Sequence, residues 1–583
     1  MNKPNIVFVL TDDQGSGDLG CNGNPWIKTP HIDAFYNESC RLSDFHVGPT
    51  CAPTRASLMT GHYANSTGVW HTVGGRSLLR KNEVSLASAL AASGYTNGIF
   101  GKWHLGDNAP YRAMDRGFHK TLVHGGGGIS QAPDWWGNDY FDDTYLEDGQ
   151  PKAFKGHCTD VWFDEAEQFI RENREKPFFC YIACNAPHSP YNIMKEYSDP
   201  YRGGLDTEDD ENRSRFYGMI SHIDERFGRL RETLNRLELE ENTILIFMTD
   251  NGTSCGGEFD EEGHLLNGWN HGLRGMKCSE YEGGHRVPFF LRWPAGGYRE
   301  QREIASLTSV VDIMPTLLDL CAVDHSLDFH GESLVPRLDD PSLENSRIVV
   351  TDSQRVPDPV MWKQSCAMTG SWRLINGKEL YNLDSDRAQR NDIAPDHPDM
   401  VETLRRGYEQ WWDLVKPDFD SEIPIEIGGS VKEVRLSSHD WRNDDGELVW
   451  NQKQVREGLP LNGYWEVEIL KPGQYEIELC RWPREGCGQF LSEGPGEDDV
   501  KWDKEGVAPD SVDFYSGGRA LEITEAECRV AGLTMKTRAG ERVVFRMELP
   551  AGPAHLETVL RTAGGVELGA YYCYVRTGSK ETF

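Results

Sequence analysis

The stretch Asn5-Ile6-Val7-Phe8-Val9-Leu10-Thr11-Asp12-Asp13-Gln14-Gly15 decides the fold of this chain. Its apolar run, residues 5–10, is short and is followed at once by polar residues, which is typical of a parallel strand buried on both faces. A second stretch ends alike, because the predicted strand at residues 243–248 continues as Thr249-Asp250-Asn251-Gly252. The two stretches predict neighbouring elements of one α/β sheet.

Helical and strand patterns alternate through about residue 340. We expect helices at residues 85–93 and 160–175, strands around 98–100 and at 177–184, and a long amphipathic helix with apolar positions from Phe216 to Leu237. This alternation predicts an α/β domain over residues 1–340, with a mostly parallel central sheet sandwiched by helices.

The remaining chain predicts two smaller units. Residues 341–420 are expected to form a small α+β subdomain, because strand patterns at 371–375 and 379–383 flank the hairpin signal Asn376-Gly377 and residues 398–414 are helical. Residues 421–583 alternate apolar and polar positions at 463–470, 474–480, 541–549, 555–561 and 567–576. That texture predicts an additional C-terminal β-sandwich domain.

Charge and composition restrict the partners. The 583 residues include 60 Lys and Arg against 93 Asp and Glu, a formal net charge of −33, which argues against nucleic acid or an anionic membrane. An anionic substrate would therefore need a positive field confined to its pocket. The 14 cysteines lack the spacing of zinc sites.

The sequence also bears on localisation. No apolar stretch approaches the length of a membrane span. The apolar run near the N-terminus is too short for a signal peptide. We therefore expect a cytoplasmic protein from the sequence as given, or a periplasmic or secreted one if a leader was removed.

Polar residues at the two strand ends predict a metal site. In a parallel sheet, carboxyl ends lie on one edge, so Asp12 and Asp13 can meet Asp250 and Asn251. Three carboxylates and an amide oxygen suit Ca²⁺, which takes only oxygen ligands, better than Zn²⁺. Each pair taken alone is better explained by local turn hydrogen bonds, and the metal site is favoured when both pairs are taken together with Cys51.

The segment from Pro49 to Gly61, with Cys51-Ala52-Pro53-Thr54-Arg55 at its centre, predicts an anion site. Pro53 fits the first turn of a short helix and Gly61 fits its exit. The free N–H groups near Cys51 would face the anion that Arg55 holds, and would favour a nucleophile there. The competing interpretation is a buried structural cysteine.

These motifs closely resemble those of the formylglycine sulfatases. Cys51-Ala52-Pro53-Thr54-Arg55, followed by a hydrophobic stretch and Thr60-Gly61, matches the activation motif Cys-x-Pro-x-Arg, whose cysteine a dedicated enzyme oxidises to formylglycine. The run from Gly94-Tyr95 to Gly101-Lys102-Trp103-His104 matches the second motif, with Asn97 where Ser or Thr is more frequent. We expect residues 102–104 to be extended, with Lys102 and His104 pointing the same way.

The resemblance assigns roles to the remaining residues. It implies that Ca²⁺ is bound by Asp12, Asp13, Asp250, Asn251 and the modified Cys51. It further implies that Arg55, Lys102, His188 and Lys277 bind the sulfate, with Arg274 an alternative to Lys277. A hydroxyl of the aldehyde hydrate would attack sulfur, His188 would protonate the leaving alcohol, and His104 would be the base that releases sulfate.

The predicted function is therefore a sulfatase that hydrolyses sulfate esters of a polysaccharide or oligosaccharide, matured by a formylglycine-generating enzyme. Two alternatives remain: a phosphonate or phosphate ester hydrolase of the same superfamily, and a catalytically silent glycan-binding homologue. Two groups of aromatic residues are candidates for sugar stacking, although core packing explains aromatic clusters more often. They are Trp135, Trp136, Tyr140, Phe141 and Tyr145 in the first domain, and Trp441, Trp450, Trp465, Trp482 and Trp502 in the last.

Overall fold

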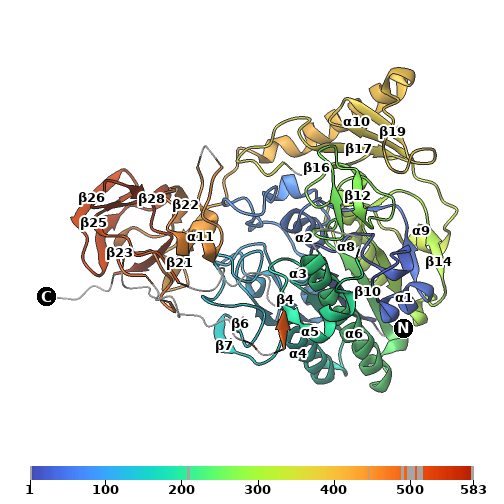
Figure 1. Ribbon diagram of the computed structural model, residues 1–583, viewed down its shortest axis with the longest axis horizontal. Helices are drawn as coiled ribbons and strands as arrows, with labels where there is room; N and C mark the ends of the chain where they lie inside the picture. The colour runs from blue at the N-terminus through green and yellow to red at the C-terminus, as the bar shows by residue number, and fades with distance from the viewer. Residues whose placement is uncertain are drawn as a thin grey trace.

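A ten-stranded mixed sheet forms the centre of the larger lobe in the computed structural model (Figure 1). The structure describes residues 3–205, 210–352, 354–443, 446–486, 491–494, 504, 506–508 and 517–578. Its strands, in spatial order, are β14 (Arg302–Ile304), β2 (Cys40–Leu42), β13 (Phe289–Arg292), β10 (Thr243–Thr249), β1 (Asn5–Thr11), β8 (Phe178–Ala183), β4 (Thr96–Gly101), β5 (Lys120–Val123), β6 (Thr144–Glu147) and β7 (Gln150–Ala153). Pairing is parallel from β10 through β5, whereas β13, β6 and β7 pair antiparallel with their neighbours.

Helices cover both faces of this sheet, as β1 makes clear. Ile6, Phe8 and Leu10 pack into one hydrophobic core, while Val7 and Val9 pack into the other. The first core includes α2 (Cys51–Thr60), α3 (Leu86–Ala92), α8 (Ile313–Leu320) and α9 (Val335–Asp339), and the second includes α1 (Pro30–Asn37), α4 (Cys158–Asn173) and α6 (Asp210–Arg236). An uninterrupted apolar strand is needed because neither face meets water, and the predicted α/β fold is confirmed.

Short elements surround the sheet. They are β3 (Phe45–His46) paired with β15 (Thr308–Ser309), β11 (Gly257–Phe259) paired with β12 (Leu265–Gly268), β9 (Ile193–Met194) paired with β24 (Val507–Ala508), and helices α5 (Lys195–Ser198) and α7 (Glu282–His285). The β9–β24 pair links the larger lobe to a segment more than 300 residues later.

A four-stranded antiparallel sheet follows the ten-stranded one in the chain. It contains β16 (Val349–Asp352), β17 (Ser365–Thr369), β18 (Trp372–Ile375) and β19 (Glu379–Asn382), and α10 (Pro398–Val415) packs on it. Asn376 and Gly377 join β18 to β19 with φ of 51° and 66°. Two consecutive positive φ values are what an Asn-Gly hairpin turn requires, so this predicted turn is confirmed.

Two further sheets face each other in the C-terminal lobe, on the left of Figure 1. One contains β20 (Ile425–Ile427), β22 (Tyr464–Ile469), β28 (Gly552–Thr562), β25 (Ile523–Val530), β26 (Leu533–Arg538) and the short β29 (Glu567–Leu568), and the other contains β21 (Glu433–Ser437), β30 (Tyr572–Thr577), β23 (Gly473–Cys480) and β27 (Val543–Leu549). Helix α11 (Gln452–Glu457) lies at the boundary with the larger lobe. Both sheets contribute to one hydrophobic core, as in a β-sandwich.

The alternating stretch at residues 567–576 is divided between two strands. β29 pairs with β28 in one sheet, whereas β30 pairs with β21 and β23 in the other. The chain crosses between sheets at Gly569, where an added Cβ would lie 2.5 Å from the Trp441 ring. The domain boundaries at residues 340 and 420 stay a prediction.

Two findings concern the whole described part of the chain. Among its helices, none combines the length and the apolar character needed to cross a membrane. Every cysteine in the described ranges is a free thiol.

Candidate active site

The ends of β1 and β10 bring four predicted metal ligands together. The strands are parallel neighbours in which Thr11 is paired with Thr249, so the residues that follow them lie abreast. The Asp13 backbone N–H donates to Asp250 Oδ1 at 3.0 Å, and Asn251 Nδ2 donates to Asp13 Oδ1 at 3.0 Å. All four side chains are buried, including that of Asp12.

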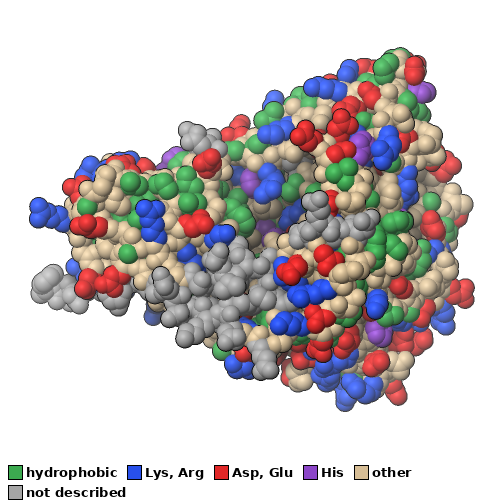
Figure 2. Space-filling view, in the orientation of Figure 1, with side chains coloured by type: hydrophobic (Ala, Val, Ile, Leu, Met, Phe, Trp, Pro, Cys, Tyr) green, Lys and Arg blue, Asp and Glu red, His purple; other side chains and the backbone are tan. Residues whose placement is uncertain are grey.

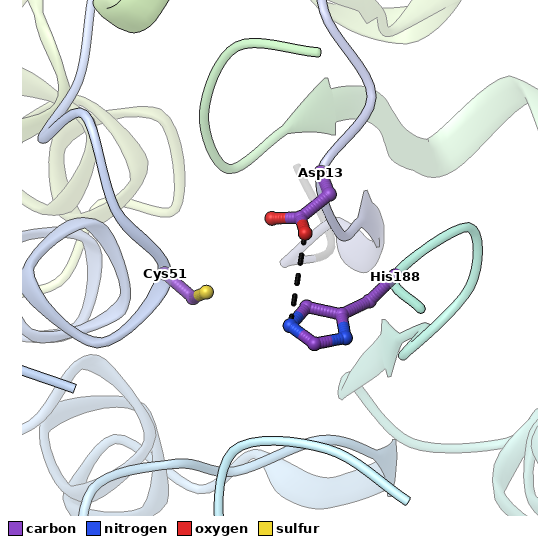
Figure 3. A group of neighbouring side chains, drawn as sticks. All are labelled: Asp13, Cys51 and His188. Carbon is purple, nitrogen blue, oxygen red and sulfur yellow. Dashed lines mark ion pairs between the residues drawn. The ribbon is translucent and has the colours of Figure 1, made fainter. Parts of the chain in front are cut away.

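Cys51 reaches the same place from another element. It is the first residue of α2, where Pro53 occupies the first turn and Gly61 ends the helix with a φ of 70°, as predicted. Possible ligand atoms lie within 4.8 Å of one another in two groups that share Cys51, one with Asp13 and His188 and one with Asp12 and Asp250. Figure 3 shows Asp13, Cys51 and His188 converging from three separate segments.

Three cations neutralise the three carboxylates. Lys102 Nζ lies 2.6 Å from Asp12 Oδ2, and Lys277 Nζ lies 2.6 Å from Asp13 Oδ2. Arg55 donates to Asp250 Oδ2 from Nη2 at 2.8 Å and from Nε at 3.2 Å. Burial alone would raise the pKa of Asp13, but Lys277, His188 and Lys102 hold it well below its usual range. Burial and the neighbouring Asp12 instead raise the pKa of Asp250 to about 7, against the opposing effect of Arg55. Three carboxylates thus face three cations in this cluster.

Two acceptor oxygens in this cluster lack partners. Asp12 Oδ1 and Asn251 Oδ1 are buried and accept no hydrogen bond from the described residues. A buried oxygen left unpaired is costly, so two such oxygens fit a site that binds a cation or water. Carboxylate and amide oxygens are the donors that Ca²⁺ prefers. The residues present therefore fit a hard divalent cation, with Asp12, Asp13, Asp250 and Asn251 as its holders.

The thiol of Cys51 is a poor nucleophile as it stands. Burial raises its pKa to about 12, although Lys102 and Lys277 act in the opposite direction. Because the thiolate is the reactive form, an unmodified Cys51 would be almost entirely protonated at neutral pH.

Two histidines each use one ring nitrogen to contact a backbone carbonyl and keep the other available. His188 Nδ1 lies 2.6 Å from the Ser189 carbonyl oxygen, and His104 Nε2 lies 2.9 Å from the Thr72 carbonyl oxygen. A carbonyl only accepts, so these nitrogens carry hydrogen and leave His188 Nε2 and His104 Nδ1 for other chemistry. His188 Nε2 lies 3.6 Å from Asp13 Oδ2, and His104 Nδ1 is buried and forms no hydrogen bond with any residue that the structure describes.

The expectation of an extended segment at residues 102–104 is wrong. His104 has a φ of 60°, so the chain turns immediately after β4. Lys102 consequently points to Asp12, whereas His104 points to Thr72.

A cavity of about 340 Å³ opens onto Cys51. Its walls include the predicted residues His104, His188 and Lys277. Arg55 and Lys102 lie behind this surface, since Arg55 also donates to the Lys102 carbonyl oxygen at 3.1 Å. Arg274 lies away from the cavity and donates to Gln389 and Tyr381.

The cavity also has walls that the motifs did not identify. Gln131, Ser254, Arg355 and Trp450 line it. Among these, Trp450 belongs to the tryptophans noted in the C-terminal sequence. Trp441, Trp465 and Trp482 are fully buried, and Trp502 lies outside the described residues.

The first aromatic cluster is divided. Tyr140 and Tyr145 are 0% and 1% exposed and belong to the core of the larger lobe. Trp136 instead packs edge-on against Trp482 of the C-terminal lobe. Core packing thus explains these residues.

Comparison with known proteins identifies the family. The sequence model of the sulfatase family matches residues 4–323. The chain therefore belongs to the sulfatase family, a family of sulfuric ester hydrolases whose members generally use formylglycine and calcium.

Several relatives carry names of sulfatases. The N-acetylgalactosamine-6-O-sulfatase of Bacteroides thetaiotaomicron is 27% identical over 69% of this chain and 92% of its own length. Arylsulfatase J of Mus musculus is 27% identical over 70% of this chain and 66% of its own length. N-acetylgalactosamine-6-sulfatase of Homo sapiens is 30% identical over 58% of this chain and 66% of its own.

Solved structures show the same fold. Ps i-CgsB, crystallised with k-i-k-neocarrahexaose, is 26% identical, with a TM-score of 0.62 over 71% of this chain and 93% of its own. The phosphonate monoester hydrolase of Agrobacterium radiobacter has a TM-score of 0.52 at 19% identity, over 72% of this chain and 96% of its own. The second likeness is one of fold alone.

Proposed function

We propose that this protein hydrolyses sulfate esters of a sulfated polysaccharide or its oligosaccharides, using Ca²⁺ and a formylglycine made from Cys51. The observation that carries the proposal is the convergence of Cys51 with Asp12, Asp13, Asp250 and Asn251. Two of their oxygens are buried and accept no hydrogen bond within the described part of the chain. Relatives named as N-acetylgalactosamine-6-sulfatases support a carbohydrate substrate.

The buried charges prepare this site for an anion. When bound, Ca²⁺ would polarise oxygens that coordinate it and add positive charge. Lys277 lines the cavity and holds Asp13, so its ammonium group can also face a sulfate oxygen. Arg55 and Lys102 fix Asp250 and Asp12 from behind, which keeps the oxygens oriented before substrate arrives.

The two histidines divide the proton transfers. His188 lies at the cavity wall with Nδ1 on the Ser189 carbonyl, which leaves Nε2 as the nitrogen that takes up a proton from solvent and gives it to a leaving alcohol. His104 holds Thr72 through Nε2, which leaves Nδ1 with a lone pair to accept a proton. The carbonyl contacts therefore leave one nitrogen free on each ring, and the two roles differ in protonation state. His188 acts as the acid when both of its nitrogens carry hydrogen, and His104 acts as the base in its neutral form.

Maturation is the first test. The protein should be co-expressed with a formylglycine-generating enzyme, and the peptide containing residue 51 analysed by mass spectrometry. We expect the aldehyde in this sample. Wild type expressed without the enzyme should show an unmodified thiol, and a Cys51→Ser control should show serine. Finding only thiol after co-expression would overturn the proposed nucleophile.

Turnover is the second test. Sulfated oligosaccharides, an aryl sulfate and a phosphonate monoester should be assayed side by side with and without EGTA. Calcium-dependent release of sulfate, fastest from the oligosaccharides, is expected. Preferred phosphonate hydrolysis would favour the alternative esterase, and glycan binding by the matured protein without any turnover would favour a silent homologue.

A further inference from the structure

A second cavity adjoins the one at Cys51. It has a volume of about 620 Å³, and the two cavities share Val73, Arg355 and Trp450 as wall residues. They are therefore adjacent parts of one cleft. Figure 2 shows a hollow between the C-terminal lobe and the larger lobe, with Lys or Arg and His side chains inside it. A glycan bound at Cys51 would have room to continue into the second cavity.

Trp450 projects from the C-terminal lobe into this cleft. Its side chain is 36% exposed, in contrast to the fully buried Trp441, Trp465 and Trp482. An exposed indole at the wall of two cavities has an apolar face available to a sugar ring. The family match ends at residue 323, so Trp450 lies beyond the matched region.

The backbone holds Trp450 in a fixed position. Its N–H donates to Gln454 Oε1 at 2.8 Å, and its carbonyl accepts from the Ala132 N–H at 2.9 Å. The next residue, Asn451, caps α11 and forms a bridge with Gln131, which lines the Cys51 cavity. A side chain on so constrained a segment loses little conformational freedom when it binds a ligand.

Arg355 supplies a positive charge at the junction. Its side chain is exposed and, among the described residues, forms no ion pair with a carboxylate, while Nη1 lies 3.3 Å from Cys278 Sγ. Cys278 follows Lys277, so Arg355 stands beside the proposed sulfate site. The described wall of the second cavity contains one carboxylate, Glu447. In a protein with a net charge of −33, an unpaired guanidinium in a cleft indicates an anionic ligand.

We propose that Trp450 and Arg355 form a subsite for the sugar next to the one being desulfated. Trp450 stacks on that sugar, and Arg355 binds a second anionic group, a sulfate or a carboxylate, on the same chain. The substrate class is thus a polyanionic oligosaccharide or polysaccharide with charges on neighbouring residues. This inference rests on the proposed function.

Kinetics on substrates of increasing length test the subsite. The matured full-length protein should be assayed on an aryl sulfate and on sulfated galactan and chondroitin sulfate di-, tetra- and hexasaccharides. Trp450→Ala should lower kcat/KM for the hexasaccharides by about tenfold or more, with a smaller loss on the aryl sulfate, and Trp450→Phe should recover most of it. Arg355→Gln should lower kcat/KM only for substrates whose adjacent sugar is charged. Comparing sulfated galactan with chondroitin sulfate shows whether Arg355 binds a sulfate or a carboxylate. Arg538→Gln, on exposed β26, is the matched control and should match wild type.

An equal loss on every substrate would show a structural role for Trp450 and would overturn the subsite. A separate binding experiment distinguishes this failure from failure of the proposed function. If wild type releases no sulfate, calorimetry with the hexasaccharides still compares Kd between wild type and Trp450→Ala. Binding weakened by about tenfold in the variant would retain the subsite, and unchanged Kd would reject it.

Discussion

Replacing Asp250 by Asn tests both the electrostatics and the metal site. Asp250 is fully buried, accepts two hydrogen bonds from Arg55, and accepts a third from the Asp13 backbone. The isosteric amide removes the charge and leaves the Arg55 guanidinium buried with Asp12 Oδ1 at 4.0 Å as its nearest remaining carboxylate. Breaking a buried ion pair costs about 3–5 kcal/mol.

Because Asp12 partly compensates, we expect a loss of about 3 kcal/mol in the free energy of unfolding. Urea unfolding in EGTA, followed by circular dichroism, measures it. Adding calcium should increase the difference in unfolding free energy between wild type and variant, since a ligand at 100 times its Kd stabilises the wild type by about 2.7 kcal/mol. The variant has lost a charged ligand and should gain much less from the same calcium.

Asp18→Asn is the matched control. Asp18 is equally buried and accepts from the Gly15 N–H at 2.7 Å, but belongs to neither group of possible metal ligands that contains Cys51. Burial raises the pKa of both Asp18 and Asp250 to about 7, but Asp250 accepts two hydrogen bonds from Arg55. Among the described residues Asp18 forms no ion pair, so its replacement leaves no buried guanidinium unpaired and should cost less. It should retain the full calcium response. Wild-type stability of Asp250→Asn in EGTA would refute the ion-pair argument, and a wild-type calcium shift would remove Asp250 from the proposed metal site.

Three further substitutions probe the frame around the site. Gly101→Ala should abolish or severely reduce soluble protein, measured as yield and melting temperature, because Gly101 has a φ of 115° and its Cβ would lie 2.0 Å from the Ala183 oxygen; normal yield would contradict the tight packing of β4 on β8. Arg373→Met should cost about 3 kcal/mol in urea unfolding, because the buried Glu282 loses a 2.6 Å hydrogen bond and keeps its ion pair with Arg286; an unchanged midpoint would refute this. Glu527→Gln should cost about 1 kcal/mol near neutral pH. The cations around Glu527 outweigh its burial and lower its pKa from 4.5 to about 2. The difference in unfolding free energy between wild type and variant should therefore be complete above pH 4.5 and vanish as pH falls toward 2. A difference that stays constant with pH would contradict the assignment.

The strand ends show why part of the site was predictable. Apolar runs identified β1 and β10, and parallel pairing with Thr11 opposite Thr249 necessarily places Asp13 beside Asp250. Cys51 was equally readable, because Pro53 and Gly61 fix the limits of α2 in the local sequence. Such features depend on short stretches and on one general property of parallel sheets.

The outer wall of the cleft was not predictable in the same way. Trp450 reaches the cavity because Ala132 and Gln131 bind the segment around it across more than 300 residues. No periodicity in the sequence specifies how one lobe docks on another. The direction of the His104 side chain was not predicted for a related reason. Its backbone has a positive φ of 60°, and the local sequence does not specify that conformation.

The distribution of charge explains how so acidic a chain can accommodate a sulfate ester. Asp12, Asp13 and Asp250 are matched by Lys102, Lys277 and Arg55, so the protein groups alone supply no net attraction for an anion. On the proposed function, the positive field must come from the divalent cation and from the N-terminus of α2 at Cys51. Arg355 extends that field outward, because no described carboxylate pairs with it. Metal binding at the strand ends would therefore determine whether a substrate is held at all, and the cleft beyond it would determine which substrate.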